Sequence, residues 1–164
     1  MSAAHDPAQD LAILAQQEAL LHFTTFTPDT AWQFGNLLRS ALLARNAGGT
    51  IEIELANHIL FTATTPGATP GQADWIRRKR NTVCRFARSS YAVGRQLELD
   101  QQTLEARHGL TLADYAAHGG GFPLRIADAF VGTIILSGLA QRDDHNLVVT
   151  AIAEHLKITI PQLP

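Results

Sequence analysis

The sequence predicts an α+β fold in which helices pack on a single antiparallel sheet of about five strands. Two pairs of short apolar runs, each joined by a turn signal, indicate β-hairpins. Segments with apolar residues at helical spacing lie before, between and after these hairpins. Because hairpins pair antiparallel, the order of elements excludes a doubly wound parallel sheet.

The N-terminal third is predicted to contain a helix, a short strand and a second helix. Asp6-Pro7 is a helix start signal, and the helical pattern continues to about Ala19. Residues 20–25 are predicted as a strand. A second start signal at Thr27-Pro28-Asp29 opens a helix that Gly48-Gly49 ends.

Four further strands form the two predicted hairpins. Residues 50–55 alternate between apolar and acidic side chains, as in a half-buried strand. Residues 59–64 return after a turn at Asn57-His58. Residues 124–126 and 130–136 make the second hairpin, so that the sheet has five candidate strands.

The remaining helices follow from start and stop signals. A loop with two prolines and two glycines over residues 65–72 leads into a long helix over about residues 73–91. Asp100 is expected to cap a short helix that Gly109 ends. Asp143-Asp144 begins the final helix.

The composition is that of a folded globular protein. The chain has 164 residues, 46% of them hydrophobic and 17% charged, which excludes disorder as the main state. We expect one domain overall, with a helical segment over residues 1–22 and the α+β domain over residues 23–160. The single cysteine, Cys84, excludes a disulfide framework and a zinc site built on several thiolates.

Charge and hydropathy argue against two classes of partner. The net charge of −2 provides no field that favours nucleic acid or an anionic membrane surface. No stretch approaches 18 consecutive apolar residues, and the N-terminus lacks a basic region followed by an apolar run. We therefore expect a cytoplasmic protein with no nucleic-acid or membrane partner.

The helix over residues 73–91 carries the first candidate site. A helical wheel places Lys79 on the apolar face, between Trp75 and Val83. A lysine in that position must extend to solvent, pair with an acid, or bind an anion. The last alternative makes Lys79, Arg78 and Trp75 candidate ligand-binding residues.

The same helix belongs to a strongly basic stretch. Seven of the thirteen basic residues lie between Trp75 and Leu97, without an acidic residue among them. They are Arg77, Arg78, Lys79, Arg80, Arg85, Arg88 and Arg95. Such a surface attracts phosphates, carboxylates or an acidic face of another subunit. The alternative is a solvated or subunit-facing helix without a ligand.

Residues 118–123, His-Gly-Gly-Gly-Phe-Pro, are the second candidate and are expected to lie outside regular structure. Glycines such as Gly119 and Gly120 let a backbone approach a ligand closely and present amides to an anion, with His118 beside them. The alternative is a tight connection into the next strand. This segment is not a phosphate loop, because no lysine followed by Ser or Thr comes after it at the required spacing. The histidines of the chain do not have the spacing of metal ligands.

These motifs resemble the haem-degrading GlcG/HbpS-like superfamily, which includes the C-terminal domain of some corrinoid adenosyltransferases. The resemblance is carried by the following residues: Gly119–Leu124, Val131–Gly138 and Asp144 for the superfamily, and Trp75–Lys79, Phe86, Ser89–Tyr91, Gly94, His118–Gly120, Ser137–Leu139 and Asp144-His145 for one branch of bacterial and fungal proteins. It covers roughly residues 23–158. It implies a five-stranded antiparallel sheet, assembly into dimers or larger rings, and haem or a corrinoid as ligands to consider. It also adds Ser137 and Gly138 to the expected site.

Three functions remain open on this basis. The first is a small-molecule binding protein for an anionic ligand bearing carboxylates or phosphates, with haem as one case. The second is a homo-oligomeric interaction protein whose arginine-rich helix is an interface. The third is an enzyme with His118 as general base and Lys79 stabilising negative charge, although no catalytic residue set is visible in the sequence.

Overall fold

The computed structural model describes residues 5–164, so the first four residues of the expected segment 1–22 lie outside it. In chain order its elements are α1 (Pro7–Leu20), α2 (Pro28–Ala44), β1 (Thr50–Leu55), β2 (His58–Thr64), α3 (Pro70–Phe86), α4 (Ser90–Leu99), α5 (Leu104–His108), β3 (Gly121–Ile126), β4 (Ala129–Ser137) and α6 (Gln141–Leu156). The α+β class and the antiparallel sheet are confirmed. Among the described residues, none of the helices combines the length and apolar character that a membrane crossing requires.

The sheet has four strands rather than the expected five, in the order β2-β1-β4-β3. Both predicted hairpins are present, and β1 pairs antiparallel with β4 to join them. Residues 20–25 do not form a strand, since only Phe23 makes a single parallel bridge, to Ile126. Leu21, Phe23 and Phe26 are instead buried in the main core. The apolar character of this segment therefore reflects core burial and not strand pairing.

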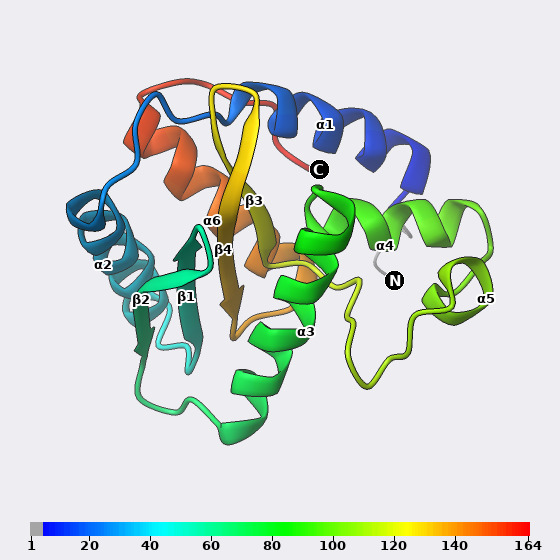
Figure 1. Cartoon of the computed structure of the whole chain (residues 1–164), viewed down its shortest axis with the longest axis horizontal. Coiled ribbons are helices and arrows are strands. Elements are labelled where there is room, and N and C mark those ends of the chain that lie inside the picture. Colours follow the sequence, from blue (N-terminus) through cyan, green and yellow to red (C-terminus); the bar gives the residue numbers. More distant parts are fainter. Residues whose placement is uncertain (1–4) are drawn as a thin grey trace.

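Helices cover both faces of the sheet (Figure 1). Ile134 and Leu136 of β4 point into the main core, which α2 and α6 complete on one face. Ile135 lies between them in sequence and points to the other face, where it packs against Ile76 and Val83 of α3. This alternation is the normal consequence of the two-residue period of a strand. β4 is therefore buried on both faces and carries its last residues to the junction of α3 and α6.

The helix predicted over residues 73–91 is two helices, and it starts earlier than expected. α3 begins at Pro70, after Thr69, whose backbone N–H donates to Gln72 at 3.2 Å. It ends at Phe86 because Ala87 adopts a left-handed conformation with φ 50°. Arg125 of β3 donates to the Ala87 carbonyl oxygen at 2.7 Å and holds this break. No glycine or proline marks it in the sequence.

Three other boundaries differ from the prediction. The N-cap of α5 is Thr103, and Asp100 is the C-cap of α4. The loop predicted over residues 118–123 ends at Gly120, because Gly121 already pairs with β4. The final helix starts at Gln141, with Asp143 and Asp144 in its first turn. Start signals thus located these elements to within a few residues, while tertiary pairing decided the actual limits.

α1 packs beside α4, on the upper right of the molecule in Figure 1. Leu14 of α1 joins Tyr91, Ala92 and Leu163 in a small buried cluster. The buried Asp10 carboxylate of α1 accepts two hydrogen bonds from Arg142 of α6, at 2.8 and 3.0 Å. The N-terminal helix is therefore bound to the rest of the chain by apolar contacts and a buried ion pair.

Candidate functional site

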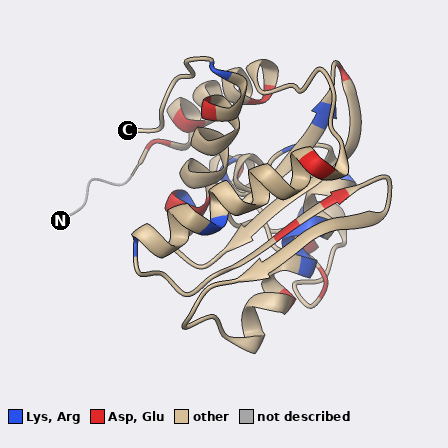
Figure 2. Cartoon of the chain, turned by 90° about the vertical axis from the view of Figure 1, so that its left-hand side faces the viewer, with Lys and Arg blue, Asp and Glu red and all other residues tan. Residues whose placement is uncertain are grey.

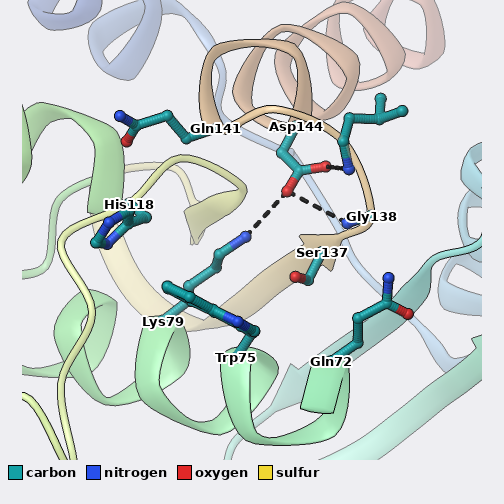
Figure 3. Close-up of a pocket in the computed structure, with 9 residues that line it drawn as sticks. Gln72, Trp75, Lys79, His118, Ser137, Gly138, Gln141 and Asp144 are labelled. Carbon is teal, nitrogen blue, oxygen red and sulfur yellow. Dashed lines mark hydrogen bonds and ion pairs between the residues drawn. The ribbon is translucent and has the colours of Figure 1, made fainter. Parts of the chain in front are cut away.

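A pocket of about 320 Å³ lies where α3, the loop before β3, the end of β4 and the start of α6 meet (Figure 3). It is lined by Gln72, Trp75, Lys79, His118, Ser137, Gly138, Leu139, Gln141 and Asp144. Five of the eight candidate site residues are among these nine. The topology brings them together because β3 begins and β4 ends beside α3 and the first turn of α6.

Lys79 forms a buried ion pair with Asp144 on one wall of the pocket. Its Nζ lies 3.0 Å from Asp144 Oδ2 and donates to the Leu136 carbonyl oxygen at 2.9 Å, and both charged residues are only 2% exposed. Of the three alternatives for a lysine on this face, the chain adopts pairing with an acid. These bonds use two of the three ammonium protons.

Burial opposes the charges of both partners. It lowers the pKa of Lys79, although the neighbouring Asp144 charge favours the protonated form. It raises the pKa of Asp144 against the influence of Lys79 and the backbone amides of Leu139 and Gly138. The pair depends on these compensating contacts, because a buried charge without a partner is costly.

Asp144 also holds the turn that follows β4. Its Oδ1 accepts from the Leu139 amide at 2.8 Å and its Oδ2 from the Gly138 amide at 3.4 Å. One carboxylate therefore joins α6, the Ser137-Gly138 turn and α3. In the sequence, Asp144 is recognisable as a helix start and as part of a motif, but not as a member of the site. The signal was the inward lysine, which requires an acid from elsewhere in the chain.

Trp75 and His118 form the aromatic side of the pocket. Their ring centroids are 5.0 Å apart in an edge-to-face arrangement. Arg78 stacks on Trp75 with its Cζ 4.1 Å from the ring centroid, and its Nε donates to Asp74 at 2.8 Å. Arg78 therefore supports Trp75 and is not one of the residues that line the pocket.

The imidazole of His118 is a neutral group at pH 7. Burial lowers its pKa below the usual value, and the positive charges of Lys79 and Arg78 lower it further. With the Lys79–Asp144 pair balanced, the ionisable lining residues together carry no net charge at this pH. Among residues 5–164, no side-chain hydrogen bond involves the His118 ring, the Ser137 hydroxyl or the Gln141 amide. These groups face the pocket and remain able to bind a ligand.

Gly119 and Gly120 lie behind the pocket wall and serve close packing of the chain on itself. A Cβ on Gly119 would lie 1.8 Å from the Gln141 carbonyl oxygen. A Cβ on Gly120, which has φ +112°, would lie 2.1 Å from the Leu136 carbonyl oxygen and 2.9 Å from Lys79 Nζ. Of the two alternatives for these glycines, the tight connection is the one that the contacts favour.

The basic stretch is largely neutralised by acids, most of which lie on other elements. Its ion pairs are Arg77 with Asp74 and Asp114, Arg78 with Asp74, Lys79 with Asp144, Arg80 with Glu52 and Glu54, Arg88 with Glu18, and Arg95 with Asp10 and Glu98. Arg85 alone lacks an ion pair within the part of the chain that the structure describes. The expected broad anion-attracting surface is therefore reduced to local pairs.

Gln72, Leu139 and Gln141 are further lining residues that our sequence analysis missed. Gln72 donates to the Gly48 carbonyl oxygen at 2.9 Å and ties the pocket rim to the start of β1. Leu139 stands in the Ser137–Leu139 motif, whereas no feature of the sequence distinguishes Gln72 and Gln141 from other polar residues. Among residues 5–164, no three His, Cys, Asp or Glu side chains gather in a group that could hold a metal ion.

The fold and the pocket define an α+β protein with a polar site between a helix, a glycine-rich loop and a strand end. The chain belongs to the family described as "Haem degrading protein HbpS-like", whose profile matches residues 26–153. This confirms the resemblance seen in the motifs. The chain is 48% identical over 153 residues to a UPF0303 protein of Serratia proteamaculans (strain 568), covering 93% of this chain and 95% of the relative.

Two solved structures share this fold. The crystal structure of the Ybr137w protein has a TM-score of 0.84 and 28% identity, covering 90% of this chain and 87% of that chain. The PduOC–haem complex has a TM-score of 0.68 and 16% identity, covering 85% of this chain and 99% of that chain. At this low identity the second similarity concerns the fold alone.

Proposed function

We propose that this protein binds a small molecule that carries an acidic group, and that the pocket beside Lys79 is its site. The observation that carries the proposal is the set of open hydrogen-bond donors facing the pocket. The third ammonium proton of Lys79, the Ser137 hydroxyl and the Gln141 amide have no acceptor in the described chain. A carboxylate offers only acceptors and therefore complements this set.

The charge balance narrows the ligand to a species with little negative charge. Lys79 shares its charge with Asp144, and the His118 imidazole is neutral. A polyphosphate would find no net positive charge in this pocket, whereas a single carboxylate is compatible with charge-assisted donation from Lys79. Trp75 offers an apolar surface for a planar part of the same molecule. An aromatic or conjugated monocarboxylate is therefore the ligand class that we favour over a phosphate.

Haem does not fit the residues of this pocket. A porphyrin requires two broad apolar faces and cations for two propionates, but Trp75 and Leu139 are the only large apolar side chains in the lining. The cation nearest the pocket, Lys79, is already paired. His118 has the imidazole that an axial ligand needs, yet the macrocycle would contact a mostly polar lining. A corrinoid, which is bulkier, meets the same obstacle.

The experiment compares benzoate with its neutral analogue benzamide. We expect benzoate to shift the NMR signals of the Trp75 indole and of the Gly138 and Leu139 amides to saturation, and benzamide to bind more weakly. Ser137→Ala should weaken benzoate binding about tenfold, the value of one hydrogen bond to a charged group. Arg88→Met, remote from the pocket lining, is the matched control and should leave the affinity unchanged.

Two outcomes would contradict this proposal. Shifts that do not saturate, or that Ser137→Ala leaves unaltered, would mean that benzoate does not use this pocket. A hemin titration that gives a Soret band of defined stoichiometry would overturn the exclusion of haem. Turnover of either compound, lost in His118→Gln, would instead favour an enzyme. The neutral His118 imidazole, which has no hydrogen-bond partner in the described chain, keeps that function as the second candidate.

A further inference from the structure

The nitrogen of Lys79 has one bonding direction that the described chain leaves open. Nζ donates to Asp144 Oδ2 at 3.0 Å and to the Leu136 carbonyl oxygen at 2.9 Å. A tetrahedral nitrogen that is bonded to Cε and to two such partners keeps a fourth direction. Lys79 lines the pocket although it is only 2% exposed, and Figure 3 shows its amine between His118 and Ser137 in that view. The open direction is therefore accessible from the pocket alone.

This direction holds a proton in the ammonium form of Lys79 and a lone pair in the neutral amine. An ammonium has three N–H groups and a neutral amine has two, and the two acceptors engage two of them. A neutral Lys79 that keeps both bonds therefore presents its lone pair to the pocket. Burial lowers the pKa of Lys79, which increases the neutral fraction. A desolvated amine of this kind is a nucleophile toward a carbonyl carbon.

We propose that Lys79 forms an imine with the carbonyl group of a 2-oxo acid bound in this pocket. The inference rests on the proposed function, because the carboxylate of the same molecule would accept from the Ser137 hydroxyl and the Gln141 amide. Lys79 Nζ and the Gly138 amide bond to the same Asp144 oxygen, so the amine is a close neighbour of the turn that contains Ser137. This closeness favours a carbonyl carbon that is attached directly to the carboxylate.

The step balances without an oxidant, a reductant or a second reactant. The ammonium gives its pocket-facing proton to the neutral imidazole of His118, which lines the same pocket. The lone pair of Nζ then forms a bond to the carbonyl carbon, and the carbonyl oxygen takes that proton back. A second proton passes from the nitrogen to this oxygen, the C–O bond breaks, and water leaves as the C=N bond forms. A protonated lysine and a ketone thus give a protonated imine and water.

The surroundings of Nζ suit the protonated imine as well as the ammonium. The imine nitrogen keeps the positive charge and one N–H group, so the buried Asp144 carboxylate keeps its partner. Neither charge is left uncompensated in the interior during the reaction. A Cβ at position 120 would lie 2.9 Å from Nζ, so Gly120 leaves space beside the nitrogen.

The chain contains its own control for a test of this reaction. Figure 2 colours the basic residues blue, and of the thirteen in the sequence only Lys79 and Lys157 are lysines. The others are arginines, whose guanidinium groups stay protonated and form no imine. Lys157 is exposed at the end of α6. A reagent that modifies accessible amines without binding therefore favours Lys157, whereas a bound 2-oxo acid modifies Lys79.

The experiment uses phenylglyoxylate with sodium cyanoborohydride, which reduces an imine to a stable secondary amine. The modified chain gains the mass of the acid less one oxygen atom, and mass spectrometry of chymotryptic peptides locates the change. We expect one modification per chain, on Lys79, at least about tenfold faster than on Lys157. Excess benzoate should slow the modification of Lys79 and not that of Lys157. Acetophenone, which has the same ketone without the carboxylate, should not prefer Lys79.

Two variants complete the test, with circular dichroism as the check that each one folds. Lys79→Arg keeps a cation for Asp144 and should lose the modification, and Lys157→Arg should retain it in full. The wild-type peptides decide the question even if Lys79→Arg fails to fold, because both lysines are compared in one chain.

Three outcomes would overturn this inference. If benzoate binds to saturation and phenylglyoxylate does not modify Lys79, imine formation fails while the proposed binding function stands. Equal modification of Lys79 and Lys157 would mean that the pocket does not promote the reaction. Modification of Lys79 that excess benzoate does not slow would mean that the amine reacts without the carboxylate site, which would exclude a 2-oxo acid as the ligand class.

Discussion

Lys79 and Asp144, which lie 65 residues apart in the sequence, form a 3.0 Å ion pair that joins α3 to α6. The Asp144 carboxylate also accepts from the Leu139 amide, so the same pair sets the turn that ends β4. The same ion pair therefore holds elements of the fold together and forms part of the pocket wall. A change at either residue alters the wall of the pocket as well as the stability of the fold.

Lys79→Met is expected to destabilise the protein by about 3–5 kcal/mol at neutral pH, the usual cost of breaking a buried pair by removing one partner. Asp144 is the buried acid that this change leaves without its partner. Denaturant unfolding measures the effect. Arg88→Met is the control, because its 3.6 Å pair with Glu18 is partly exposed and should contribute at most about 1 kcal/mol.

A double variant separates the stranded charge from lost packing. Lys79→Met combined with Asp144→Asn keeps a carbonyl oxygen for the Leu139 amide and removes the charge. It should recover most of the free energy of unfolding. A double variant no more stable than Lys79→Met would show that the lysine acts through packing and not through its pair.

The hairpins and the inward position of Lys79 were predictable because both follow from local periodicity. Alternation over residues 50–55 identifies a strand, and a helical wheel needs only neighbouring residues. The strand is not half-buried as expected, because Glu52 on its acidic face is buried as well. The false strand at residues 20–25 arose because apolar residues bury equally well in an irregular segment. The break at Ala87 was invisible because Arg125, a distant residue, stabilises it.

The site was predictable in part for a similar reason. Residue type and motif pointed to Trp75, Lys79 and His118, which do line the pocket. The partner Asp144 depends on a contact between two helices that no local pattern specifies. The glycines of the loop could be identified from the sequence as positions of close backbone approach. Only the packed fold shows which atoms occupy the space that a Cβ at each of them would need.

Gly120→Ala should destabilise the protein more than Gly109→Ala. Both glycines have positive φ, at +112° and +66°, and strain there costs about 1–3 kcal/mol. A Cβ at Gly109 meets no atom within 4 Å, whereas one at Gly120 also collides with the Leu136 carbonyl oxygen. Thermal and denaturant unfolding give the comparison. Equal losses would mean that backbone strain, and not close packing, explains the glycine at position 120.

His145 should make stability depend on pH between about 6.5 and 3. Its side chain is buried, its Nε2 lies 2.8 Å from Gln17 Oε1, and burial together with the Arg142 charge lowers its pKa to about 3. In this window the unfolded chain binds the proton and the folded chain does not. Stability from this residue is therefore complete above about pH 6.5 and is lost as the pH falls toward 3, by up to about 1.4 kcal/mol per unit.

The measurement compares the pH slope of the free energy of unfolding in wild type and His145→Gln. The variant should show a shallower slope between pH 6 and 4, whatever its absolute stability. His108→Gln, at an exposed position, is the control and should keep the wild-type slope. Equal slopes in wild type and His145→Gln would mean that His145 is protonated in the folded protein without a cost.

Binding of a carboxylate probe should strengthen as the pH falls. The lowered pKa of His118 keeps its imidazole neutral at pH 7, and acid converts it to a cation in the pocket. The pKa of Asp144 is raised, so acid also begins to neutralise the one carboxylate on the wall. Both changes favour an anion, and Lys79 and Arg78 are the other charged groups nearby. Benzoate affinity measured by calorimetry from pH 8 down to pH 5 should therefore rise, and benzamide affinity should stay constant.

His118→Gln should flatten the benzoate profile while leaving binding at pH 8 nearly unchanged, since the imidazole is neutral there. A benzoate profile that is flat in wild type, or equally steep in His118→Gln, would mean that the acidic group of the ligand does not lie beside this histidine.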